Sequence, residues 1–115
     1  MSIEKHQYTT ARGTLPYLFR KADALSHSQA DALAGKAPLV VFLHGAKDRG
    51  NDLSLPLAWG FPKFVAAADS LPYNFLALQI PQETTWPDWR NELFLLIDSL
   101  AQVHAIDPAR VVTGW

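Results

Sequence analysis

The chain has 115 residues, 49% of them hydrophobic and 18% charged, and ten basic against eleven acidic side chains give a net charge of −1. This composition excludes a disordered chain, which would be poor in apolar residues and strongly charged. The balanced charge provides no basic surface for nucleic acid, and the absence of cysteine excludes disulfides and thiolate metal sites. The longest clear apolar run, residues 38–43, is too short to cross a bilayer, and the first residues, MSIEKH, contain no apolar segment of the kind expected of a secretory signal. We therefore expect a soluble, cytoplasmic domain without a membrane or nucleic-acid partner.

The first third of the chain predicts two strands and a connection between them. Residues 15–20 are apolar and aromatic but include Pro16, which cannot donate to a ladder, so they predict an edge strand. Residues 22–37 are small and polar and predict a surface connection, with a short helix over 28–33 as the alternative. Residues 38–43 are an uninterrupted aliphatic run, which is typical of a parallel strand buried on both faces.

A helix and a further strand follow the polar loop 44–52. Apolar residues recur at helical spacing over residues 57–68, with Pro62 near the first turn, where its missing N–H does no harm. Residues 75–80 form a second apolar run that ends at Pro81, and they predict a second buried strand.

The last third of the chain predicts a second helix and a third buried strand. Thr85 and Asp88 have the spacing of a capping box, and residues 89–103 carry an apolar stripe at helical spacing. Residues 110–113 then begin the third strand. This alternation predicts an α/β fold with a mostly parallel sheet and flanking helices.

The loop after the first buried strand contains the pattern with the clearest chemical meaning. A strand that ends in His44-Gly45 turns sharply, and Gly45 has no side chain to block an incoming group. The backbone N–H groups of Ala46 and Lys47 would then point into a cleft at the carboxyl end of the sheet, where open α/β sheets bind ligands. Two convergent N–H groups would form an oxyanion hole. The alternative is that this segment is only a tight turn.

Several segments resemble α/β-hydrolase esterases, in the order in which that family has them. Residues 43–52 read LHGAKDRGND and resemble the family's LHGAGERGxD loop, as in phospholipase/carboxylesterase and polyhydroxybutyrate-depolymerase-like enzymes. Residues 59–62 read WGFP and residues 79–82 read QIPQ, which resembles the strand end aPQ. Residues 106–115 read IDPARVVTGW and resemble iDpxRvyvtGxSxGG, the approach to the nucleophile elbow. The resemblance covers residues 9–115.

This resemblance implies that residues 1–115 are the N-terminal part of a single α/β-hydrolase domain. The activity would be that of a serine carboxylic-ester hydrolase working by acyl transfer, without a cofactor or metal. The Ala46 N–H would be an oxyanion donor and Gly45 would give the loop its geometry. The serine would follow Trp115, with the acid and histidine further on, so this chain alone is predicted to be inactive. Its partners would be a small ester and the remainder of the domain on a contiguous or separate chain, with association of the fragment with itself as the alternative to that remainder.

The resemblance also suggests residues that line the substrate site. Lys47 stands where the family has glycine, and it either favours an anionic substrate or points to solvent. Trp86 and Trp115 are candidates to line the acyl or alcohol side, and ordinary packing is the alternative for both.

Four further residues are expected to support the loop. His44 follows a buried strand, which favours a structural hydrogen-bonding role over that of a base. Asp48, which replaces the family's glutamate, and Arg49, Asn51 and Asp52 form a dense polar cluster. We expect this cluster to hold the loop through internal hydrogen bonds and an ion pair.

Other functions have less support in the sequence. A non-catalytic α/β module that binds a partner through its open sheet edge is the main alternative. A nucleotide-binding domain is the weakest, because no glycine-rich phosphate loop follows any predicted strand. No spacing of histidine and carboxylate residues resembles a metal site.

Overall fold

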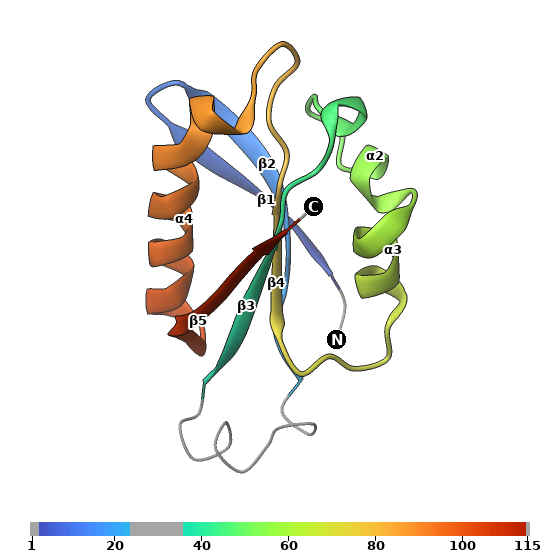
Figure 1. Ribbon diagram of the computed structural model, residues 1–115, viewed down its shortest axis with the longest axis vertical. Helices are drawn as coiled ribbons and strands as arrows, with labels where there is room; N and C mark the ends of the chain where they lie inside the picture. The colour runs from blue at the N-terminus through green and yellow to red at the C-terminus, as the bar shows by residue number, and fades with distance from the viewer. Residues whose placement is uncertain (1–2, 24–35, 115) are drawn as a thin grey trace.

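The fold is a five-stranded sheet with helices on both faces, seen in a computed structural model that describes residues 3–23 and 36–114 (Figure 1). The strands are β1 (Glu4–Thr10), β2 (Gly13–Arg20), β3 (Ala37–Phe42), β4 (Asn74–Leu78) and β5 (Ile106–Gly114). The helical segments are the 3₁₀ turn η2 (Ala46–Asp48), α2 (Ser54–Leu57), α3 (Gly60–Ala67), the 3₁₀ turn η3 (Trp86–Trp89) and α4 (Arg90–Val103). The helix considered over residues 28–33, and most of the expected surface connection, lie outside the described residues.

The strands lie in the order β1-β2-β4-β3-β5. β3 pairs in parallel with both β4 and β5, whereas β1 and β2 form an antiparallel hairpin that joins β4 in antiparallel fashion. The predicted α/β fold with flanking helices is confirmed, but the sheet is mixed rather than mostly parallel. The antiparallel part of the sheet is the β1–β2 hairpin. The strand pattern of β1 is weak in the sequence, because this strand is polar and largely exposed.

β2 is an interior strand, which corrects the prediction that Pro16 places it at an edge. Its ladder with β4 begins at Tyr17, so the missing N–H of Pro16 falls outside that ladder. The carbonyl of Pro16 instead accepts a hydrogen bond of 2.9 Å from the N–H of Gln79.

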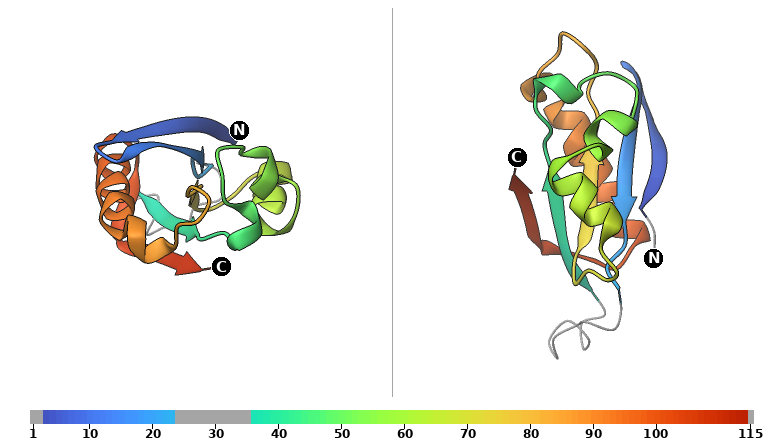
Figure 2. Two further views of the ribbon diagram at one scale, coloured as in Figure 1. Left: turned by 90° about the horizontal axis from the view of Figure 1, so that it is seen from above. Right: turned by 90° about the vertical axis from the view of Figure 1, so that its right-hand side faces the viewer.

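The helices bury the two faces of the sheet in two separate apolar clusters. Figures 1 and 2 show α4 on one face and α2 with α3 on the other. In the cluster on the α4 side, the apolar stripe of α4 packs against residues of β2, β3 and β4. The cluster on the α2 and α3 side has fewer buried residues. The fully buried members on the α4 side include Leu15, Phe19, Leu39, Val41, Leu76, Leu78 and Ile80. The buried members on the α2 and α3 side are Leu18, Leu53, Val65, Leu71, Phe75 and Ala77.

The helix predicted over residues 57–68 is interrupted. Residues 58–59 separate the single turn α2 from α3, and Gly60, the first residue of α3, has a φ of 69°, in the left-handed region that favours glycine. Phe64, which the helical spacing assigned to the core, is 59% exposed because the helix turns that position toward solvent.

The second predicted helix is confirmed as α4, preceded by η3. Thr85 and Asp88 form the predicted capping box, with the Thr85 N–H donating to the Asp88 carboxylate at 2.8 Å. The apolar stripe from Trp89 to Leu100 is buried, but Val103 at the end of the helix is 77% exposed.

β5 differs most from expectation. It begins at Ile106 rather than at Arg110, and only Ile106 is fully buried, although residues 110–113 were predicted to be a buried strand. In the described part of the chain β5 pairs only with β3 and stands at the edge of the sheet, which leaves Val112 58% exposed.

Candidate functional site at the carboxyl end of the sheet

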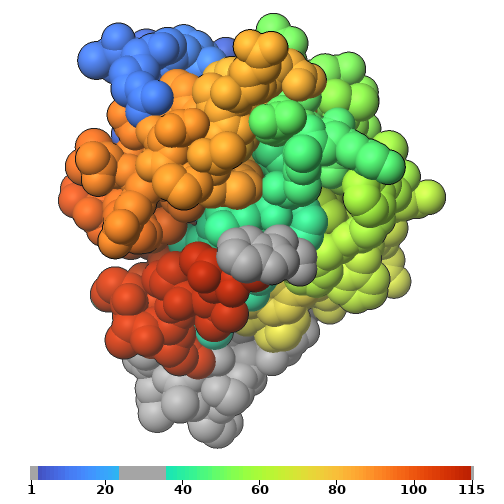
Figure 3. All heavy atoms as spheres, turned by 45° about the horizontal axis from the view of Figure 1, so that its top comes forward, coloured from blue at the N-terminus to red at the C-terminus, as the bar shows by residue number. Residues whose placement is uncertain are grey.

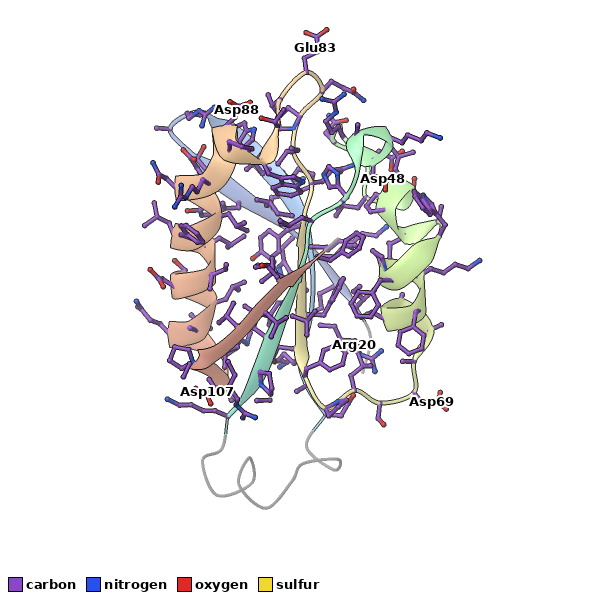
Figure 4. The ribbon with its side chains drawn as sticks, viewed as in Figure 1. Arg20, Asp48, Asp69, Glu83, Asp88 and Asp107 are labelled. Carbon is purple, nitrogen blue, oxygen red and sulfur yellow. The ribbon has the colours of Figure 1, made fainter. Side chains whose placement is uncertain are left out.

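The loops after β3 and β4 meet at one end of the sheet. These two strands are parallel, so their carboxyl ends lie together, which is where open α/β sheets bind ligands. Figure 3 shows the loop after β3 (green) beside the loop after β4 (orange). In Figure 4, Asp48 and Glu83 mark this end, and Arg20 and Asp107 mark the other. A mostly apolar cavity of about 140 Å³ lies between the two loops. It is lined by His44, Gly45, Ala46, Arg49, Ile80, Thr84, Thr85 and Trp86.

The end of β5 reaches the same place. The N–H of Leu43 donates to the carbonyl of Gly114 at 2.7 Å, so the pairing of β3 with β5 continues to the residue before His44. Gly114 therefore lies beside the start of the loop that carries Gly45 and Ala46. Trp115 itself lies outside the described residues, and its suggested place at the substrate stays a prediction.

His44 is buried, and its ring joins the two loops. Its Nε2 accepts the N–H of Ile80 at 3.1 Å, and its Nδ1 lies 2.7 Å from the carbonyl of Gly45. Burial lowers the pKa of His44, and the positive charge of Arg49 lowers it further, partly opposed by the Gly45 carbonyl and the charge of Asp48. These contacts are those of a structural hydrogen-bonding residue.

Trp86 supports the same loop. Its Nε1–H donates to the carbonyl of His44 at 3.0 Å, and its ring lies 5.0 Å from the His44 ring, centre to centre. The half-buried indole also lines the cavity. The packing expected as the alternative for Trp86 is present, and its suggested place beside the acyl or alcohol part of a substrate stays a prediction.

Gly45 and Ala46 stand exposed at the start of η2. Gly45 has ordinary extended dihedral angles, and a Cβ added there would meet nothing within 4 Å, so the space beside it is open. Its carbonyl accepts the N–H of Asp48 at 3.1 Å. Within residues 3–23 and 36–114, the N–H of Ala46 has no hydrogen-bond acceptor. It is thus available to a ligand.

Arg49 holds the loop through main-chain carbonyls. Its Nε donates to the carbonyl of Ala46 at 3.1 Å and its Nη1 to that of Thr84 at 3.0 Å. The ion pair expected between Arg49 and a neighbouring carboxylate is not formed in the described part of the chain. Gln82 completes the connection by donating to the carbonyl of Arg49 at 2.9 Å.

The other members of the polar cluster differ in their surroundings. Asp48 is buried and lines a small cavity of about 20 Å³ with Phe42 and Trp59. Asn51 is exposed, and its side chain makes no hydrogen bond to the described residues, so the structure gives it no part in holding the loop. Lys47 is exposed as well.

Gln79 is a supporting residue that sequence reasoning missed. It is fully buried, and its Nε2 donates to the carbonyls of Asp48 and Asp52 at 2.8 and 2.9 Å. The only available signal was a polar amide inside the apolar run that ends at Pro81.

The described residues contain no group of three or more histidine and carboxylate side chains placed to hold a metal ion. None of their helices combines the length and the apolar character needed to cross a membrane.

Comparisons with known proteins identify the fold. A thermostable esterase of known crystal structure superposes with a TM-score of 0.72 at 22% identity, over 97% of this chain and 33% of its own. A lipase/esterase from Lactobacillus plantarum superposes with a TM-score of 0.60 at 16% identity, over 98% of this chain and 44% of its own. No family model matches the sequence, and no curated protein sequence matches it significantly.

The chain thus spans less than half the length of both esterases. It has the fold of the N-terminal part of an esterase α/β-hydrolase domain.

Proposed function

We propose that this chain supplies the oxyanion-hole loop of a serine carboxylic-ester hydrolase whose nucleophile, acid and histidine lie beyond residue 115. The observation that carries the proposal is a juxtaposition. The Ala46 N–H has no acceptor in the described part of the chain, and the strand leading into its loop runs beside the end of β5 at Leu43 and Gly114. A nucleophile on the segment after β5 would therefore stand next to this donor.

The proposed reaction is acyl transfer. The serine oxygen attacks the ester carbonyl carbon, and its proton passes to a histidine base. The carbonyl oxygen becomes an oxyanion, which accepts hydrogen bonds from the Ala46 N–H and from the N–H of the residue after the serine. Collapse expels the alcohol, which takes the proton, and water then releases the acid by the same steps.

The surroundings of Ala46 fit an uncharged ester more readily than a charged one. The lining of the adjacent cavity is mostly apolar, and the guanidinium of Arg49 is engaged by two main-chain carbonyls. Lys47 is exposed, which favours its pointing to solvent over a role in binding an anionic substrate.

A partner-binding module without catalysis remains the second candidate, favoured by the open edge of β5. Val112 is 58% exposed there, and exposed apolar strand edges pair readily with other chains. Catalysis distinguishes the two candidates, because a binding module has no reactive serine.

The test uses the full-length protein that contains this chain. We expect hydrolysis of p-nitrophenyl acetate or butyrate, and reaction of one serine with a fluorophosphonate probe, mapped by peptide mass spectrometry to the segment just after Gly114. Replacement of Ser99, which is exposed on α4, by alanine is the matched control and should change neither result. Absence of hydrolysis, or a probe adduct elsewhere in the chain, would contradict the proposal.

A further inference from the structure

Arg12, in the turn between β1 and β2, contacts the start of α4. Its guanidinium carbon lies 4.1 Å from the centre of the Trp89 ring, which is the geometry of a cation–π contact. Its Nη1 also donates to the carbonyl of Asp88 and lies 3.5 Å from the Glu92 carboxylate. Figures 1 and 2 show this turn beside η3 and the start of α4. The hairpin is thus attached to the segment that follows the candidate site.

The turn that carries Arg12 is held by its own main chain and by Thr10. The hydroxyl of Thr10 donates to the carbonyl of Gly13 at 2.8 Å and accepts the N–H of Arg12 at 3.0 Å. Gly13 has a φ of 133°, a conformation that favours glycine. None of these features uses the Arg12 side chain, so it can be replaced without loss of the turn.

Trp89 connects Arg12 to the wall of the cavity between the loops after β3 and β4. Trp89 is only 4% exposed beneath the exposed Arg12, so the guanidinium lies between its ring and solvent. Its Nε1–H donates to Oγ1 of Thr84 at 3.1 Å, and that hydroxyl donates in turn to the carbonyl of Pro81 at 2.7 Å. Thr84 lines the cavity of about 140 Å³. The indole therefore holds a residue of the cavity wall from behind.

We infer that Arg12 is a positioning residue that holds the Thr84 wall of the cavity through Trp89 and so contributes to substrate binding. The inference rests on the proposed function. Arg12 does not itself line the cavity, so it acts through the two residues between them. A wall that packs against the ester binds its ground state and its transition state alike, so loosening the wall raises KM and leaves kcat near its original value.

Arg12→Gln in the full-length protein is the first test. It removes the guanidinium and keeps the turn. Arg90→Gln is the matched control, because it also removes an exposed guanidinium from an aromatic ring, 5.8 Å from the centre of Phe94, on a part of α4 without a contact to Thr84.

We expect KM for p-nitrophenyl butyrate to rise about 2- to 5-fold in Arg12→Gln, the effect of one exposed cation–π contact, with kcat unchanged. Arg90→Gln should change neither constant. A merely structural arginine predicts less folded enzyme, which lowers the apparent kcat and leaves KM as it was. An unchanged KM in Arg12→Gln, or a fall in kcat at unchanged KM, would overturn the inference.

Thr84→Val tests the route through Trp89, because valine keeps the shape of threonine and removes the hydroxyl that the indole binds. If Arg12 acts through this bond, adding Arg12→Gln to Thr84→Val should raise KM no further. Two increases in KM that multiply in the double variant would show that Arg12 does not act through Thr84.

A final measurement does not depend on activity. In NMR spectra of the full-length protein, hydrogen exchange of the Trp89 indole N–H should be faster in Arg12→Gln, and the Thr84 amide resonance should shift. Neither should change in Arg90→Gln. If the unmodified protein hydrolyses no ester, the proposed function fails, and these resonances alone decide whether Arg12 holds the wall. An unmoved Thr84 resonance in Arg12→Gln would show that it does not.

Discussion

Gln79→Leu tests whether the β4 side chain holds the candidate site together. The substitution removes the donors to the carbonyls of Asp48 and Asp52, at 2.8 and 2.9 Å. Each such bond contributes about 0.5–1.5 kcal/mol net, so the two contribute about 1–3 kcal/mol. The buried Gln79 Oε1 atom has no hydrogen-bond partner among residues 3–23 and 36–114, and its removal offsets part of this loss. We expect a net destabilisation of about 1–2 kcal/mol.

The assay is urea unfolding of the full-length protein followed by tryptophan fluorescence, with kcat measured in parallel. Gln79→Glu should be worse than Gln79→Leu at neutral pH, because it turns a carboxylate toward two carbonyl oxygens. Gln102→Leu, at an exposed position of α4, is the control and should stay within about 0.5 kcal/mol. An unchanged stability in Gln79→Leu, or a Gln79→Glu protein as stable as the original, would refute this reasoning.

Arg49→Ala should lower thermal stability and kcat without changing the preference among acyl chains, since the guanidinium holds two main-chain carbonyls; a switch between acetyl and octanoyl esters would indicate substrate contact instead. Burial lowers the pKa of His44 in the folded protein. As the pH drops below about 6.5, His44 is therefore protonated in the unfolded chain before it is protonated in the folded one, and the free energy of unfolding should fall. His44→Asn should flatten this pH dependence, measured by urea titrations at several pH values. Residues 1–115 expressed alone should associate through the exposed edge around Val112 and hydrolyse no ester; size-exclusion chromatography showing a stable monomer would contradict this.

The parts of the fold that the sequence predicts well are those with one dominant signal. The apolar runs over 38–43 and 75–80 favour strands, and the structure has β3 and β4 there. β4 is buried throughout, whereas β3, predicted to be buried on both faces, alternates between buried and half-buried residues. The Thr85–Asp88 capping box marks its helical start through local hydrogen bonds alone, which need no tertiary information.

The errors arise where the tertiary arrangement decides. Pro16 predicts an edge strand, and only the tertiary structure shows that the ladder of β2 with β4 begins one position later, at Tyr17. The apolar residues in 110–113 predict a buried strand, but β5 lies at the edge of the described sheet and is therefore largely exposed there.

In the candidate site, the sequence indicates the position of Ala46 but not the network around it. Gln79 and Trp86 are far from the loop in sequence, and their hydrogen bonds go to main-chain carbonyls, which leave no pattern in the residue types. The expected ion pair of Arg49 fails for the same reason, because carbonyl oxygens take the place of a carboxylate.

The most direct test of the central claim is Ala46→Pro in the full-length protein. Proline removes the N–H, and its fixed φ suits the first residue of η2. Gly45, with a ψ of 178°, has the extended conformation that proline favours in the residue before it. Ala46→Gly, which keeps the N–H, is the control. We predict that kcat for p-nitrophenyl butyrate falls about 10²–10³-fold in Ala46→Pro with the fold intact, and little in Ala46→Gly. An Ala46→Pro enzyme within a factor of about two of the original, when 10²-fold is expected from loss of an oxyanion donor, would contradict the account.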